Sequence, residues 1–206
     1  MQYTGAITAM LRFIPLLLLT ASLFGQVFEV GATGGLSKIM NNGLGSTASQ
    51  PNSPATNLSL ADGWRLGFRM AINNFRYFGN EFGYAYNRTK LRFDTAPPQE
   101  QGMAIHQGFY NFLAYAQEEG KRVRPFAAGG VHFSNFVPPG SSASYGGGST
   151  KFGINYGGGL KIHLSGKFGI RFDYRQYQTP KPFGLPGASG WLRQNEISAG
   201  FSYLMM

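Results

Sequence analysis

The segment FGIRFDYRQY, residues Phe168 to Tyr177, contains two interleaved residue patterns. One parity is apolar and aromatic: Phe168, Ile170, Phe172 and Tyr174. The other parity carries glycine and charge: Gly169, Arg171, Asp173 and Arg175. Because successive side chains of a β-strand point to opposite faces, this segment predicts a strand with one apolar and one charged face. The fold depends on which of the two faces is the outside.

The same period of two recurs along the chain and predicts further strands. Clear alternation occurs over residues 28–33, 64–73, 81–87 and 151–162, and alternation or context adds 105–116, 123–133 and 196–203. Segment 105–116 is apolar at both parities, so its faces cannot be assigned. With Phe168 to Tyr177 these segments make eight strands.

The composition also favours an all-β protein. The 206 residues include 30 Gly, 18 Phe and 11 Tyr but only 13% charged residues, which suits aromatic strands and turns better than surface helices. There is no cysteine, so no disulfide holds the fold. The net charge is +9, but the sequence contains no run of basic residues interleaved with aromatic ones, so we do not predict nucleic-acid binding. His106 and His163 are isolated, so we predict neither a metal nor a cofactor.

The N-terminal residues resemble a secretory signal peptide. Arg12 precedes the apolar run Phe13 to Leu19, and small or polar residues follow it. The run is shorter than the roughly 20 residues that a membrane-spanning helix needs. We therefore predict a signal peptide over residues 1–25, cleaved near Gly25 or Gln26, and one exported domain over residues 26–206.

The connections between the predicted strands alternate in length. Long polar stretches cover residues 37–62, 88–104, 134–150 and 178–195, and short ones cover 74–80, 117–121 and 165–167. An antiparallel up-and-down barrel whose two ends face different compartments has this asymmetry, with short periplasmic turns and long external loops. It would also place both chain termini on the periplasmic side.

In water the charged faces would be the outside, which would give a sandwich or a soluble lipocalin-like binding protein. In a membrane the faces are reversed. Three features favour the membrane: the apolar parity is nearly uninterrupted, each strand is about ten residues long, and the opposite parity mixes charges with Gly and Ala that fit a narrow lumen. We predict an eight-stranded antiparallel transmembrane β-barrel.

This assignment places charged side chains inside the barrel, where they must pair or be hydrated. The predicted luminal charge network comprises Arg65, Arg69, Glu81, Lys161, Arg171, Asp173, Arg175 and Glu196, and the same parity adds Glu29, Arg122 and Arg124. We expect these residues to fill the lumen and to leave little conduction, with a narrow basic conduit as the alternative.

The chain resembles the small eight-stranded outer-membrane β-barrel family, of the type of the outer-membrane protein A transmembrane domain. The resemblance runs from Val27 to Tyr203 and rests on the stretches VRPFAAGGV, NYGGGLKIHL and GIRFDYRQY and on an aromatic final strand. It implies a monomer in the bacterial outer membrane, inserted by the barrel-assembly machinery and surrounded by outer-membrane lipid and lipopolysaccharide. It implies a structural or surface-interaction role, in which rim cations could meet lipopolysaccharide phosphates: Arg88, Lys90, Arg92, Lys181 and Arg193.

One short motif suggests an enzyme instead. His132, Phe133, Ser134 and Asn135 resemble the His-x-Ser-Asn element of outer-membrane lipid A deacylases, in which His and Ser form an esterase site. A carboxylate should orient the histidine, but no Asp or Glu occurs between Glu119 and Asp173. We therefore predict no enzyme and keep the deacylase, with His132 and Ser134 as its catalytic residues, as the weaker alternative.

Overall fold

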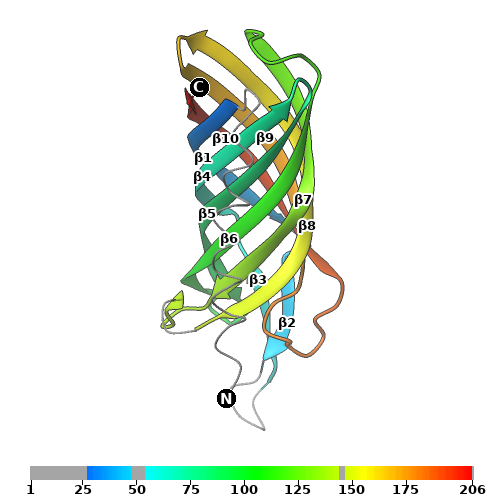
Figure 1. The fold of residues 1–206 in the computed structure, drawn as a ribbon. Coiled ribbons are helices and arrows are strands. Elements are labelled where there is room, and N and C mark those ends of the chain that lie inside the picture. The colour runs from blue at the N-terminus through cyan, green and yellow to red at the C-terminus, as the bar shows by residue number, and fades with distance from the viewer. Residues whose placement is uncertain (1–26, 48–53, 144–146, 206) are drawn as a thin grey trace, which may run out of the picture.

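The computed structural model describes residues 27–47, 54–143 and 147–205. The predicted signal peptide lies outside these residues. The chain forms ten strands, joined by turns and loops (Figure 1). The strands are β1 (Val27–Met40), β2 (Gly43–Thr47), β3 (Thr56–Leu60), β4 (Gly63–Phe75), β5 (Phe78–Phe93), β6 (Gln99–Tyr115), β7 (Val123–Val137), β8 (Ser149–Ser165), β9 (Phe168–Pro180) and β10 (Trp191–Met205).

Eight of these strands close into one antiparallel barrel. Neighbours in sequence pair throughout, β1 pairs with β10, and pairing of β5 with β6 completes the ring. The two remaining strands, β2 and β3, form a small hairpin that joins the wall through β5. The predicted eight-stranded antiparallel barrel is therefore confirmed, and the predicted loop 37–62 contains an additional hairpin.

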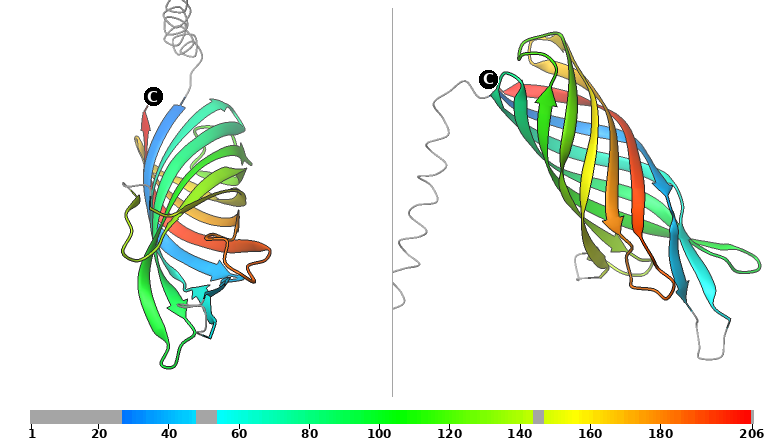
Figure 2. Two further views of the ribbon diagram at one scale, coloured as in Figure 1. Left: turned by 90° about the horizontal axis from the view of Figure 1, so that it is seen from below. Right: turned by 90° about the vertical axis from the view of Figure 1, so that its right-hand side faces the viewer.

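The two ends of the barrel differ, as the spacing of the strands predicts. The short-turn end has connections 76–77, 116–122 and 166–167, and it also holds the paired residues Phe28 and Met205 near the start of β1 and the end of β10. In the β8–β9 turn, Gly166 has φ of 54°, a left-handed conformation that glycine adopts without strain. The long-loop end has connections 41–62, 94–98, 138–148 and 181–190. The described residues of 41–62 and 181–190 extend beyond the barrel wall (Figure 2).

The loop boundaries differ from those predicted. Residues 88–104 are mostly not a loop: β5 runs to Phe93, β6 starts at Gln99, and this hairpin extends past the rest of the wall. The charged residues Lys90 and Arg92 were interpreted as loop residues, but they occupy the exposed face of a strand that alternates with Leu91 and Phe93. A strand that leaves the membrane keeps its pairing and changes only the polarity of its outer face.

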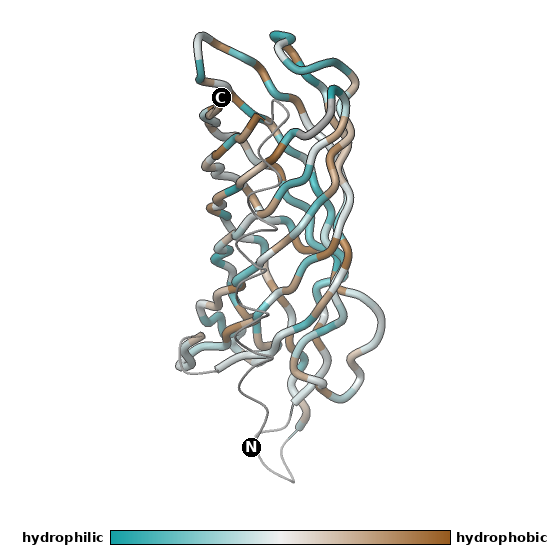
Figure 3. The backbone as a smooth tube through the Cα atoms, viewed as in Figure 1, coloured by the Kyte–Doolittle hydropathy of each residue, from teal (hydrophilic) through white to brown (hydrophobic). Residues whose placement is uncertain are grey.

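The apolar parity faces outward along the barrel. Large side chains such as Phe172, Phe201 and Trp64 are 47%, 70% and 46% exposed, while Arg171 and Arg175 are 3% and 0% exposed. Figure 3 shows the alternation of hydrophilic and hydrophobic residues along the strands. This outer surface of exposed aromatic residues suits lipid rather than water. No helix among the described residues is long and apolar enough to cross a membrane.

Candidate functional site: the polar interior of the barrel

The centre of the lumen is a network of buried ion pairs contributed by four strands. Arg69 of β4 contacts Glu196 of β10 at 2.5 Å and Glu81 of β5 at 3.3 Å. From β9, Arg171 contacts Glu81 at 2.5 Å and Arg175 contacts Glu81 at 2.8 Å. The charged groups are thereby held by strands from opposite sides of the barrel, and their pairing offsets the cost of burying charge.

Asp173 joins the two arginines of its own strand. Arg171 donates from Nε to Asp173 Oδ2 at 2.7 Å and from Nη2 to Oδ1 at 2.8 Å, a bidentate arrangement. Arg175 Nη2 donates to the same Oδ1 at 3.1 Å. The alternation RFDYR in the sequence thus places three charged side chains together on one face of β9.

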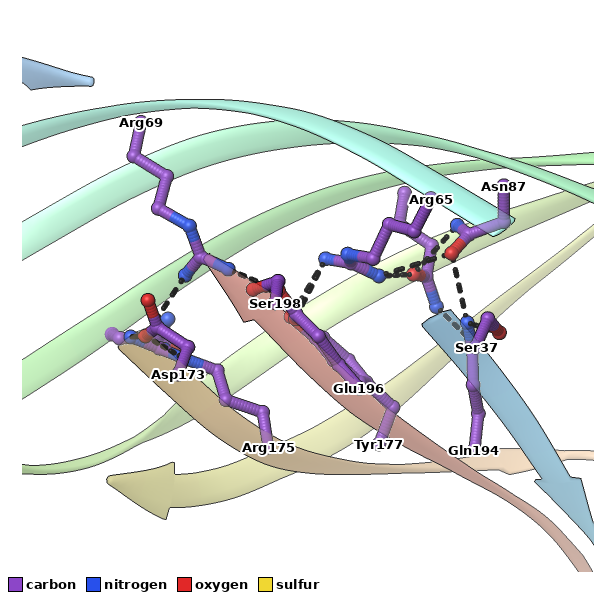
Figure 4. A network of polar contacts seen from close by, with 12 residues as sticks. Ser37, Arg65, Arg69, Asn87, Asp173, Arg175, Tyr177, Gln194, Glu196 and Ser198 are labelled. Carbon is purple, nitrogen blue, oxygen red and sulfur yellow. Dashed lines mark hydrogen bonds and ion pairs between the residues drawn. The ribbon is translucent and has the colours of Figure 1, made fainter. Parts of the chain in front are cut away.

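Toward the long-loop end, the charges give way to amides and hydroxyls (Figure 4). Arg65 contacts Glu196 at 3.2 Å, donates from Nη1 to Gln107 Oε1 at 2.5 Å and from Nη2 to Tyr177 Oη at 2.8 Å. Gln107 in turn donates to Gln194 Oε1 at 2.9 Å. These residues link β4, β6, β9 and β10 across the lumen.

The structure brings seven of the eight predicted luminal residues into this network, and Lys161 lies in a separate pair. Lys161 contacts Glu29 at 2.5 Å and donates to Tyr115 Oη at 2.8 Å. Arg122 was predicted to point into the lumen because it shares the parity of Arg124, and this prediction is wrong. The strand β7 begins at Val123, so Arg122 lies in the preceding turn and is exposed.

Sequence reasoning missed several uncharged members of the network: Ser37, Asn87, Gln107, Tyr177 and Gln194. The alternation along β9 was sufficient to predict an inward Tyr177, because Tyr177 lies an even number of positions from Arg171 and Arg175. It failed for Gln107 because 105–116 is apolar on both faces. The structure turns the odd-numbered residues of β6 inward, so Phe109 and Leu113 are buried in the lumen beside the polar residues.

Both ends of the lumen are closed by further contacts. At the long-loop end lies an apolar cap, consisting of Ile39, Leu44, Leu58, Leu60, Leu91, Met103, Ile105, Phe136 and Leu192. The β2–β3 hairpin supplies part of this cap and is tied to loop 181–190 by a 2.9 Å hydrogen bond from Ser46 N to Pro186 O. At the short-turn end Arg124 lies 3.8 Å from the centre of the Tyr115 ring and contacts Glu119 at 2.6 Å.

The deacylase alternative rests on His132, in the predicted strand 123–133, and on Ser134, at the start of the predicted loop 134–150. The loop position of Ser134 is wrong, because β7 continues to Val137, and both side chains are buried inside the barrel. His132 Nε2 is hydrogen-bonded to Thr179 Oγ1 at 2.8 Å, and Ser134 Oγ accepts from Gln107 Nε2 at 3.0 Å. His132 Nδ1 has no hydrogen-bond partner among the described residues. Within that same part of the chain, no group of three or more His, Asp or Glu could hold a metal ion.

Comparisons with known proteins agree with this architecture. The family model described as outer membrane protein beta-barrel domain matches residues 13–204. The outer membrane protein OprG from Pseudomonas aeruginosa has a TM-score of 0.58 at 11% identity, covering 86% of this chain and 95% of that one. Neisserial surface protein A has a TM-score of 0.56 at 10% identity, covering 87% and 99%.

A third similar structure is the outer membrane protein AlkL, determined in DMPC lipid bilayers. Its TM-score is 0.56 at 16% identity, covering 86% of this chain and 90% of AlkL. At such identities, the structural likeness shows a shared fold and nothing about ligands. No curated protein matches the sequence.

Proposed function

Because the chain belongs to the outer membrane protein beta-barrel domain family and resides in the bacterial outer membrane, we propose that it is a closed scaffold with a structural or surface-interaction role. The observation that carries this proposal is the filled lumen. The apolar cap, the amide residues and the ion pairs follow one another along the barrel, and Arg65, Arg175 and Glu196 are at most 1% exposed.

Conductance in planar lipid bilayers tests the closed lumen. We expect the purified, folded protein to give no discrete channels, because eight strands leave room only for side chains. A porin of roughly 16 strands, which encloses an aqueous channel, serves as the positive control. Stable, reproducible open levels from the wild-type barrel would contradict the proposal and favour the narrow basic conduit.

The proposed surface role requires that the long-loop end faces the cell exterior. Gly140 in loop 138–148 and Gly120 in turn 116–122 provide matched sites for a short epitope tag inserted directly after the glycine, because the glycine itself is kept and the space around its Cα is open. We expect antibody to label intact cells tagged at Gly140, and to label the Gly120 variant only after the outer membrane is opened. The reverse result would invert the barrel and remove the surface role.

The absence of enzymatic activity is also part of this proposal. It is supported by the partners of His132 and Ser134, since neither residue is hydrogen-bonded to the other or to a carboxylate in the described structure. We expect the lipid A mass profile of cells to be the same without the protein, with the wild type and with Ser134→Ala. Loss of an acyl chain with the wild type but not with the variant would establish a deacylase.

A further inference from the structure

The central ion-pair network of the lumen carries more positive than negative charge. Its members are four arginines and three carboxylates: Arg65, Arg69, Arg171, Arg175, Glu81, Asp173 and Glu196. All seven are buried, with at most 4% of the residue exposed. A guanidinium group does not lose its proton in a protein, so titration cannot remove the surplus of one positive charge. An uncompensated buried charge is very costly, and the lumen therefore needs one more negative charge.

No other carboxylate side chain of the protein is placed to supply that charge. The whole sequence contains nine Asp and Glu residues, of which three belong to the network and Glu29 is held by Lys161 at 2.5 Å. The remaining five lie at the two ends of the barrel, in the connections or on the tip of the β5–β6 hairpin: Asp62, Asp94, Glu100, Glu118 and Glu119. The compensating charge must therefore come from an ion in solution.

Arg175 is the arginine of the network with the clearest need for another acceptor. Both of its carboxylates are shared: Glu81 also contacts Arg69 and Arg171, and Asp173 contacts the same two arginines. Figure 4 shows Arg175 beside Asp173 in the interior. Arg175 Nη1 is buried and has no hydrogen-bond partner among the described residues. A charged donor left unpaired in the interior is costly, so this group favours a bound acceptor.

A second unpartnered side chain lies next to Arg175 on the inner wall. Asn155 of β8 is 2% exposed, and neither its Nδ2 nor its Oδ1 has a hydrogen-bond partner in the described part of the chain. Asn155 is paired with Tyr177, two residues from Arg175 along β9. Asn155 and Arg175 are therefore diagonal neighbours, with about 7–8 Å between their backbones. Their unpartnered donors can meet at one small ligand.

The neighbouring strands add a third unpartnered group across a position without a side chain. Asn155 is paired with Gly130 of β7, and Gly130 is paired with Asn111 of β6. Asn111 Nδ2 donates to Glu81 Oε1 at 3.2 Å, and Arg175 Nη2 contacts the same oxygen at 2.8 Å. Asn111 Oδ1 lacks a partner within the described residues and leans over Gly130, where a β-carbon would lie 2.6 Å from it. The two amides thus flank the space beside Arg175.

We propose that the lumen binds one small monovalent anion, chloride, between Arg175 and Asn155. Arg175 Nη1 and Asn155 Nδ2 donate to the ion, and its charge brings the central network to neutrality. A water molecule beside the ion donates to the amide oxygens of Asn155 and Asn111, which an anion cannot satisfy. Water alone would satisfy the amides but would leave the surplus charge. The inference rests on the proposed closed lumen, in which the ion is part of the packed interior.

Urea unfolding of the folded protein in lipid vesicles at several chloride concentrations tests the site. Chloride is varied from about 1 mM to about 300 mM, with gluconate keeping the ionic strength constant, because an ion that binds only the folded state raises the folding equilibrium constant. Above the dissociation constant, one bound ion gives about a tenfold rise for each tenfold rise in chloride. We expect this response from the wild type. A flat response over the whole range would overturn the proposal and leave only water at the site.

Two variants locate the effect. Asn155→Leu removes the amide donor at similar side-chain size and should make the folding equilibrium constant independent of chloride. Thr33→Val is the matched control, because the Thr33 hydroxyl is also buried without a partner among the described residues but lies on β1, which takes no part in the site. It should keep the response of the wild type. The same chloride response in both variants would contradict the assignment to Asn155.

Anomalous diffraction from wild-type crystals grown in bromide locates the ion without any variant. We expect one bromide within about 3.5 Å of both Arg175 Nη1 and Asn155 Nδ2. Peaks on the outer surface alone would show an adventitious ion only and would overturn the proposal. Open levels in planar bilayers would refute the closed lumen itself, whereas silent bilayers together with chloride-independent stability would refute the anion alone.

Discussion

Glu81 is the carboxylate on which the luminal network converges. It is fully buried and contacts Arg171 at 2.5 Å, Arg175 at 2.8 Å and Arg69 at 3.3 Å. Glu81→Gln keeps the shape of the side chain but leaves three buried guanidinium groups with one less negative partner. Removing one member of a buried ion pair costs about 3–5 kcal/mol. We expect Glu81→Gln to lower the free energy of unfolding by about that amount.

Arg171→Leu is the informative comparison because it removes charge of the opposite sign from the same network. The ion-paired arginines outnumber the carboxylates: Arg65, Arg69, Arg171 and Arg175 against Glu81, Asp173 and Glu196. Loss of one arginine leaves equal numbers, so we expect a smaller cost, about 1.5–3 kcal/mol for the charge-assisted hydrogen bonds. Glu118→Gln breaks an exposed pair and should cost at most about 1 kcal/mol.

Urea unfolding in phospholipid vesicles measures these differences. Tryptophan fluorescence follows the transition, and gel mobility without heating reports the folded fraction independently. The order of destabilisation should be Glu81→Gln, then Arg171→Leu, then Glu118→Gln. Equal stability of Glu81→Gln and Glu118→Gln would contradict the convergence of the network on Glu81, and so would the largest destabilisation in Arg171→Leu.

Two further predictions concern the barrel wall and the tip of the β5–β6 hairpin. Gly130→Ala would place its β-carbon 2.0 Å from a carbonyl oxygen of β6, whereas a β-carbon at Gly129 would meet no atom within 4 Å. In urea unfolding, Gly130→Ala should lower the free energy of unfolding by about 1–3 kcal/mol, and Gly129→Ala should change it by at most about 0.5 kcal/mol. Equal stabilities of the two variants would contradict this packing. Hydrogen bonds from Lys90 and Arg92 hold the pKa of Glu100 below its usual 4.5. The ion pairs of Glu100 with Lys90 and Arg92 are therefore complete above pH 4.5, and they are lost as the pH falls through the lowered pKa. NMR chemical shifts at the tip of the β5–β6 hairpin should change between about pH 6 and about pH 3 in the wild type but not in Glu100→Gln. Unchanged wild-type shifts would argue against these ion pairs.

The sequence was sufficient for the barrel because its period of two is strict and the connection lengths alternate. Residues 64–73 and 168–177 specify their faces without any knowledge of their partners. The ends of strands were harder to predict, because β5 and β7 continue beyond the apolar band. There Lys90 and Asn135 occupy strands, although their polarity suggested loops.

Parity identified which charged residues share the interior but not which of them touch. Contacts across the lumen, such as Arg69 with Glu196, depend on strand order and register around the closed ring. The apolar cap had no local signal either, because Leu58 and Leu60 come from a hairpin that folds back over the lumen.

The closed lumen and the lipid-facing wall both depend on which strand face is outside, and tryptophan quenching by brominated lipid tests this most directly. Phe172 points outward and is 47% exposed, whereas Phe109 points inward and is 6% exposed. In a background with Trp64 and Trp191 changed to Phe, a single tryptophan is placed at either position and the protein is folded into vesicles of brominated phosphatidylcholine. We predict strong quenching at position 172 and little at 109. Equal quenching at both positions, or stronger quenching at 109, would contradict an apolar outer face and a polar lumen.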